Sequence, residues 1–190
     1  MAESDLSARP GEAVVVGVAV PVPSPWREVL DQARIASGDP FGGTVPAHLT
    51  LLGPTEIDAG DLAAAQARLD EVSAAFGPFN LHLRGTGSFR PVTEVVFVAV
   101  VDGIAGCERL EAAIRTGPMA RERSFPYHPH ITVAQNVPSE ALDRAFDELS
   151  GFEAKFPVAS FTLYTHPSPG NPEAAAVPWT PTKVYPLTGT

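Results

Sequence analysis

Two short segments of the sequence repeat a histidine and a threonine at the same spacing. They read His48-Leu49-Thr50-Leu51 and His130-Ile131-Thr132-Val133. Successive side chains of a β-strand point to opposite faces, so the histidine and threonine of each segment would share one face and the aliphatic residues the other. Each segment therefore offers an imidazole beside a hydroxyl.

Acid–base chemistry on a phosphodiester is what such residues can perform together. If the two strands lie near each other in one sheet, His48 and His130 converge on one concave face with Thr50 and Thr132. A neutral imidazole can take a proton from water while a protonated one gives a proton to the leaving oxygen, which favours an optimum near neutral pH. Threonine hydroxyls can donate hydrogen bonds to phosphate oxygens whose negative charge grows in the transition state.

Three residues just before the second segment are candidates for substrate binding. Arg121 and Arg123 lie in a polar stretch, and a guanidinium matches the oxygens of a phosphate, although both side chains could simply be solvated loop charges. Tyr127 could line a pocket in which a base stacks, or it could cap the core.

His128 leaves a metal-binding interpretation open. His128 and His130 have the spacing of residues on one strand face, and His48 could complete a zinc or iron site. No carboxylate lies near either segment in the sequence, and the threonines would then have no role. Pro129 could also turn His128 aside, which would make it a loop residue at the rim of the site.

The elements that must position these residues follow from the periodicity of apolar residues. The pattern predicts strands at residues 14–20, 45–52, 79–89, 95–101, 130–134 and 158–164, with residues 184–187 closing the chain. It predicts helices at 26–35, 61–75, 107–115 and 139–149, a hairpin turn at 91–94 and a surface loop at 120–126. Each half contains a His-x-Thr strand followed by a helix, which indicates an internal duplication.

With both motifs placed on strands, the sequence resembles the two-histidine (2H) phosphoesterase superfamily. This group includes 2′-5′ RNA ligases and 2′,3′-cyclic phosphodiesterases. The resemblance rests on the two His-x-Thr motifs, each followed by an apolar residue, on their separation from residue 48 to residue 130, and on the terminal segment 179–187. It therefore covers most of the chain.

This resemblance implies an α+β fold that is bilobal and pseudo-twofold, a duplicated arrangement of antiparallel sheets flanked by helices. It also implies a metal-independent hydrolase, without a cofactor, that acts on the 2′,3′-cyclic phosphate of a nucleotide or RNA end. His48 and His130 would be the acid and base, and Thr50 and Thr132 would hold the phosphate. The natural substrate, the direction of the reaction and the choice of base stay open, as does a non-catalytic module that binds a phosphorylated ligand.

Composition limits the other classes of function. Hydrophobic residues make up 44% of the 190 residues, and we expect one domain over residues 13–190 after a flexible polar segment at 1–12. The net charge of −9 opposes the broad positive surface that binds long nucleic acid, although a small pocket can still bind phosphate. The sequence contains neither a GxGxxG fingerprint nor a P-loop, so the usual cradles for dinucleotides and nucleoside triphosphates are missing.

The single cysteine and the absence of long apolar runs bear on where the protein acts. Cys107 excludes an intrachain disulfide, which fits a reducing compartment. No apolar run has the length of a membrane span, and the acidic start lacks the basic flank of a signal peptide. We therefore expect a cytoplasmic protein that does not associate with membranes. We also expect a monomer, although the sequence leaves the oligomeric state open.

Overall fold

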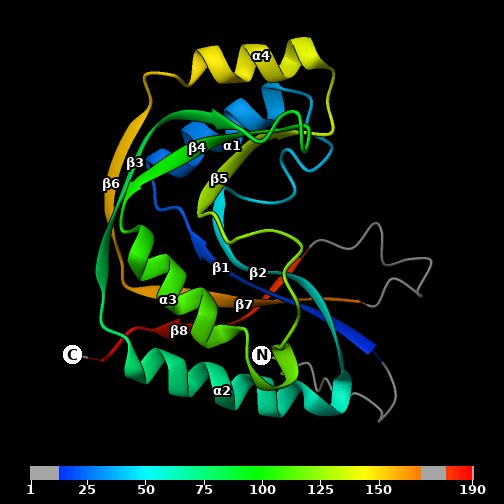
Figure 1. The fold of residues 1–190 in the computed structure, drawn as a ribbon, viewed down its shortest axis with the longest axis vertical. Coiled ribbons are helices and arrows are strands. Elements are labelled where there is room, and N and C mark those ends of the chain that lie inside the picture. Colours follow the sequence, from blue (N-terminus) through cyan, green and yellow to red (C-terminus); the bar gives the residue numbers. More distant parts are fainter. Residues whose placement is uncertain (1–12, 168–178, 190) are drawn as a thin grey trace, which may run out of the picture.

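The computed structural model describes residues 13–167 and 179–189, and these residues form two antiparallel sheets of four strands each with helices packed around them (Figure 1). The fold is therefore α+β, as the sequence predicts. The predicted flexible segment at 1–12 lies outside the described residues.

The first sheet has the strand order β2-β1-β7-β8. Its members are β2 (His48–Asp58), β1 (Ala13–Pro21), β7 (Ser160–Pro167) and β8 (Thr180–Pro186). The valine-rich strand β1 pairs with both β2 and β7 and is buried on both faces along most of its length, which explains its continuous apolar sequence.

The second sheet has the order β5-β4-β3-β6. Its members are β5 (His130–Gln135), β4 (Val95–Asp102), β3 (Phe79–Ser88) and β6 (Glu153–Val158). The antiparallel strands β3 and β4 are joined by a turn that includes residues 91–94, which confirms the predicted hairpin.

Four α-helices lie in the described ranges. They are α1 (Trp26–Ala36), α2 (Leu62–Ala75), α3 (Ile104–Ile114) and α4 (Ser139–Glu148), and short 3-10 turns lie at Ala59–Asp61 and Gly117–Met119. Helix α4 packs on β3, β4 and β5, whereas α1 contacts β5 and α3 contacts β2. Each motif strand therefore touches a helix of the other lobe. None of these helices is long and apolar enough to cross a membrane.

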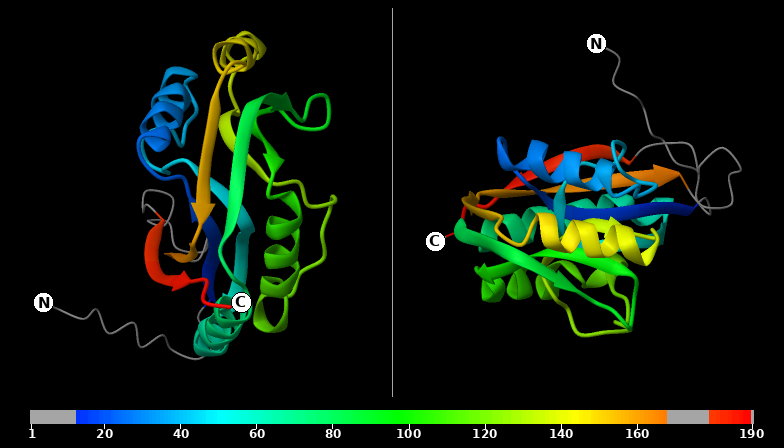
Figure 2. Two further views of the ribbon diagram at one scale, coloured as in Figure 1. Left: turned by 90° about the vertical axis from the view of Figure 1, so that its left-hand side faces the viewer. Right: turned by 90° about the horizontal axis from the view of Figure 1, so that it is seen from above.

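The two lobes repeat one arrangement, in which the His-x-Thr strand lies at the edge of its sheet beside a strand rich in valine. The two edge strands β2 and β5 contact each other where the lobes meet (Figures 1 and 2). The pseudo-twofold, bilobal architecture expected from the sequence is confirmed.

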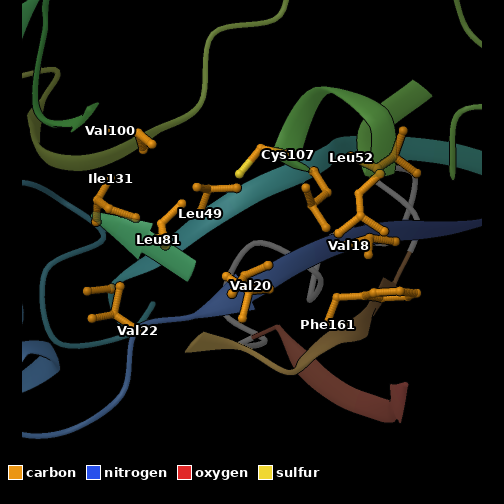
Figure 3. Packing of buried hydrophobic residues seen from close by; sticks show 14 of the residues in the cluster. Val18, Val20, Val22, Leu49, Leu52, Leu81, Val100, Cys107, Ile131 and Phe161 are labelled. Atoms are coloured by element: carbon orange, nitrogen blue, oxygen red, sulfur yellow. The ribbon is translucent and has the colours of Figure 1, made fainter. Parts of the chain in front are cut away.

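A shared hydrophobic core holds the motif strands from behind. Leu49 and Ile131, the middle residues of the two motifs, are fully buried in one cluster with Val18 and Val20 of β1 (Figure 3). Burying such a side chain contributes about 1.5–3 kcal/mol relative to leaving it exposed. The aliphatic face of each motif therefore fixes which way its histidine and threonine point.

The structure corrects three details of the predicted elements. The two motif strands lie in two sheets rather than in one. Strand β2 begins at His48 and continues to Asp58, past Pro54, which an edge strand tolerates because one side of it makes no ladder hydrogen bonds. Strand β6 was missed, although its residues alternate regularly between exposed and buried.

Candidate active site

The two imidazoles are held by the same backbone contact in each lobe. His48 Nδ1 lies 2.8 Å from the carbonyl oxygen of Pro46, and His130 Nδ1 lies 2.7 Å from that of His128. A carbonyl can only accept, so each Nδ1 carries the proton and donates it. Each Nε2 is left as the atom that can accept or donate a proton in the cleft.

Burial lowers the pKa of both histidines. For His48, desolvation is the main cause, and the nearby Arg34 charge adds to it, while the hydrogen bond to Pro46 opposes it. For His130, desolvation again comes first, and repulsion from His128 and His48 lowers the pKa further. Both shifts favour the neutral imidazole at pH 7 in the free protein, and a bound anion would favour the protonated form of one of them.

Two adjoining pockets lie at the motif strands and share Thr132 and Gln135 in their linings. The larger, about 610 Å³, is lined by His130 and Thr132, and the smaller, about 340 Å³, is lined by His48, Thr50 and also Thr132. Neither threonine hydroxyl has a hydrogen-bond partner within the described part of the chain. The four predicted residues thus come together at one cleft, with both hydroxyls available to a ligand.

Two phenylalanine rings support His130, whereas no such ring contact is found for His48 in the part of the chain that the structure describes. The rings of Phe89 and Phe97 lie 4.9 and 5.3 Å from the His130 ring between centroids, the first at 90° to it. Phe97 in turn covers Gly87, where a Cβ atom would approach the Phe97 ring to 2.5 Å. This glycine therefore makes room for the ring that supports one of the two imidazoles.

Tyr127 lines the larger pocket, but its hydroxyl is used inside the protein. The hydroxyl donates a 2.9 Å hydrogen bond to the carbonyl oxygen of Thr50 in the other lobe. Burial raises the pKa of Tyr127, so the donor keeps its proton. The bond ties the segment before one motif to the backbone of the other, which makes Tyr127 a positioning residue in addition to a pocket wall.

Replacing Tyr127 by phenylalanine should weaken this connection without emptying the pocket. The lost hydrogen bond predicts a free energy of unfolding lower by about 0.5–1.5 kcal/mol, measured by urea denaturation. Because the two motifs would be less well aligned, we expect kcat to fall more than KM rises for the substrate proposed below. An unchanged kcat with a raised KM would instead indicate that the hydroxyl contacts substrate.

The two candidate arginines are placed differently. Arg123 lines the larger pocket, where its guanidinium pairs with the buried carboxylate of Glu111, which Arg115 also contacts at 2.6 Å. Arg121 instead donates to the backbone carbonyls of Ala120 and Glu56 and lines neither of the two pockets at the motifs. The structure therefore brings Arg123 to the cleft and leaves Arg121 outside it.

His128 lies just before strand β5 and borders the larger pocket. Its ring is 6.2 Å from that of His130 and sits against Phe89 and Phe97. Within residues 13–167 and 179–189, no three or more His, Cys, Asp or Glu side chains are grouped so that they could hold a metal ion. The set of His48, His128 and His130 is therefore not assembled as a metal site.

Matching β-bulges bring two more residues into the cleft. In β2, Thr50 and Leu52 pair with the consecutive residues Ala19 and Val18, so Leu51 is extra. In β5, Thr132 and Ala134 pair with the consecutive residues Phe97 and Val96, so Val133 is extra. A bulge shifts the alternation of faces by one residue.

The residue after each bulge therefore faces the pockets. This residue is Gly53 in β2 and Gln135 in β5, and Gln135 lines both pockets. The sequence reasoning missed both. The signal was the interrupted alternation Leu51-Leu52 and Val133-Ala134, two consecutive apolar residues at the same place in each motif.

The lobes and the paired motifs define a two-histidine phosphoesterase fold. Comparison with known proteins agrees, and the chain belongs to the 2′-5′ RNA ligase superfamily, whose family model matches residues 21–169.

Bacterial relatives in sequence carry phosphoesterase names. The protein BH1439 of Halalkalibacterium halodurans is 28% identical over 134 residues, which cover 70% of this chain and 73% of that protein. The protein Bcer98_0945 of Bacillus cytotoxicus is 31% identical over 99 residues, which cover 52% of this chain and 57% of that protein. The match thus spans little more than half of the Bacillus relative.

Solved structures show the same fold over nearly the whole chain. E. coli LigT complexed with NADP+ superposes with a TM-score of 0.67 at 23% identity, and LigT complexed with 3′-AMP with a TM-score of 0.64 at 26% identity. Each comparison covers 93% of this chain and 99% of LigT.

Proposed function

We propose that the chain is a metal-independent phosphodiesterase that opens the 2′,3′-cyclic phosphate of a nucleotide or RNA end. The observation that carries this proposal is that the two imidazoles are held in the same way in the two lobes. His48 and His130 each donate Nδ1–H to a backbone carbonyl two residues earlier, which leaves Nε2 for catalysis. Each has a threonine hydroxyl on the same strand face, Thr50 or Thr132, that has no hydrogen-bond partner among residues 13–167 and 179–189.

The proposed reaction needs one imidazole in each protonation state. A neutral Nε2 takes a proton from water as the water oxygen bonds to phosphorus, and the bond from phosphorus to one ribose oxygen breaks. The imidazolium on the other side gives its proton to that leaving oxygen, and the product is a phosphomonoester. Thr50 and Thr132 would donate hydrogen bonds to the non-bridging oxygens as their charge grows.

Known proteins support a nucleotide as the ligand. The solved structure of E. coli LigT with 3′-AMP contains a ribonucleotide with a phosphate on its ribose, and it shares the fold at 26% identity. Here the larger pocket, about 610 Å³, and the smaller, about 340 Å³, both lie in the size range of pockets for small molecules.

The direct test is hydrolysis of adenosine 2′,3′-cyclic phosphate by the pure protein, with and without a strong chelator. ³¹P NMR would identify the product as a 2′- or 3′-phosphomonoester. We expect turnover that the chelator leaves unchanged and that is lost in the His130→Ala variant. Loss of turnover in chelator would favour metal-dependent chemistry, and binding without turnover would favour the non-catalytic module.

The lowered histidine pKa values predict an acid-shifted pH profile for kcat/KM. The active form of the free enzyme has one neutral and one protonated imidazole, and it is most populated between the two pKa values. Both values lie below the ordinary 6.5 because burial disfavours the charged form. Above them the acid is lost, and below them the base is lost.

The maximum of kcat/KM should therefore lie on the acid side of pH 6.5, rather than near neutrality as the sequence alone suggests. A bound phosphate anion raises the pKa of a facing imidazole, so the profile of kcat should be displaced toward neutral pH relative to that of kcat/KM. Initial rates across the pH range give both profiles. A maximum of kcat/KM on the alkaline side of neutrality would contradict this assignment.

A further inference from the structure

Three aromatic side chains contribute to the walls of the smaller pocket, beside His48. Trp179, Tyr164 and Phe41 line it, together with backbone of β1 and β2 and the residues of the first motif. Its volume of about 340 Å³ is near the lower limit of small-molecule pockets, which suits one ring system with a sugar better than an extended oligonucleotide.

The indole of Trp179 packs directly on β1 at Gly17, which has no side chain. Gly17 interrupts an otherwise valine-rich strand, and a Cβ atom there would lie 3.1 Å from Cζ3 and 3.5 Å from Cη2 of Trp179. The indole therefore lies directly against the bare backbone of the strand. On another side its ring is 5.3 Å from that of His166, tilted by 37°. These contacts hold the indole as a fixed wall of the pocket.

Away from the motif residues, two polar side chains in the wall of this pocket are already bound within the protein. The Nε of Arg34 donates to Asp39 at 2.9 Å, and the hydroxyl of Thr44 donates to the carbonyl of Phe41 at 3.1 Å. The larger pocket differs, because Arg115, Arg123 and the carboxylates of Glu111 and Glu122 are part of its lining. Both pockets have aromatic side chains in their walls, with Phe89, Phe125 and Tyr127 in the larger one, but most of the charged side chains gather on the His130 side.

We infer that the smaller pocket binds a planar aromatic ring carried by the substrate, namely the base of the nucleoside, with Trp179 as its stacking surface. The inference rests on the proposed function for the identity of the phosphate ester. It also fixes the orientation of the substrate, with the nucleoside toward Thr50 and β2 and the departing or incoming group toward the larger pocket. Because stacking is tolerant of base identity, both purines and pyrimidines should bind, and purines more tightly.

Fluorescence can test this directly because the chain has two tryptophans. Trp26 stacks on Phe156, with ring centroids 5.7 Å apart, and lines neither pocket, so a Trp26→Phe variant leaves Trp179 as the reporter. Titration with 3′-AMP should quench its emission to saturation. Inorganic phosphate should compete with 3′-AMP but cause little quenching of its own.

Calorimetry on variants of Trp179 and Gly17 would measure how much this wall of the smaller pocket contributes to the affinity for 3′-AMP. Trp179→Ala should weaken the binding of 3′-AMP by about fivefold to 150-fold, the range expected for loss of one base–aromatic stack, while the affinity for inorganic phosphate stays within about twofold. Trp179→Phe, which keeps a ring, should recover most of the loss. Gly17→Ala should weaken 3′-AMP binding by moving the indole, whereas Gly151→Ala, where a Cβ meets nothing within 4 Å, should not.

The outcomes separate this inference from the proposed function. Wild-type affinity for 3′-AMP in both Trp179 variants, or quenching by phosphate as strong as by 3′-AMP, would overturn the inference even if the enzyme hydrolyses cyclic phosphates. Base-dependent quenching and a loss of affinity in Trp179→Ala, without any turnover in the wild type, would support the ring site and count against the proposed hydrolase.

Discussion

Replacing either His48 or His130 by alanine is expected to lower kcat/KM for a 2′,3′-cyclic phosphate by about 10²- to 10⁴-fold, the range that general acid or base catalysis contributes. Either change removes one of the two Nε2 atoms at the cleft. Both side chains are only partly buried and face the pockets, so the free energy of unfolding should change by less than about 1 kcal/mol. Steady-state rates and urea denaturation measure the two effects separately.

Replacing both His48 and His130 by alanine gives a second test of the two-histidine mechanism. Because the acid and the base act in one step, losing both should cost little more than losing one. His82→Ala is the matched control, since that imidazole pairs with Glu153 at 2.8 Å and lines neither pocket. Full activity in both single variants would sink the two-histidine mechanism, and so would an equal loss in the control.

Replacing Asp39 by alanine is expected to cause the largest loss of stability, about 3–5 kcal/mol. The side chains of Arg34 and Asp39 are 5% and 0% exposed, with Nε and Oδ2 2.9 Å apart. Asp39 also accepts the backbone N–H of Phe41 at 2.8 Å. The variant leaves a buried guanidinium without a counter-charge, and urea denaturation would measure the cost.

The same substitution should change the pH profile. Arg34 already lowers the pKa of His48, and without Asp39 its charge would lower that pKa further, which should move the maximum of kcat/KM toward more acidic pH. Asp70→Ala serves as the control, because the ion pair between Asp70 and Lys183 is exposed and should contribute less than about 1 kcal/mol. Equal losses of stability in the two variants would refute the importance of burial.

The faces of the motif strands could be predicted from the sequence because each strand has one buried side. Leu49 and Ile131 are fully buried, while His48 and His130 are partly exposed, as the alternation requires. The pairing of strands could not be predicted in this way. Periodicity shows which face of a strand is buried, but neighbours in a sheet are chosen by contacts far apart in the chain, so the sequence could not show that the motifs lie in two sheets.

The roles of the loop residues also depended on distant partners. Tyr127 donates its hydroxyl to Thr50, 77 residues earlier in the chain, and no local pattern signals this bond. Arg121 and Arg123 have the same local character, yet only Arg123 meets the buried Glu111 beside the pocket. The bulge before Gln135 could have been predicted, because the interrupted alternation is visible in the sequence itself.

The placement of the sheet edges bears on aggregation. An unpaired strand edge can recruit another chain, and prolines and lysines at an edge oppose such pairing. In this fold the motif strands β2 and β5 direct one edge of each sheet toward the other lobe. The outer edges are β8, with Pro181, Lys183 and Pro186, and β6, with Lys155 and Pro157. The arrangement that brings the histidines together therefore also shields from intermolecular strand addition the edge of β5, which has no proline or lysine, and that of β2, which has only Pro54.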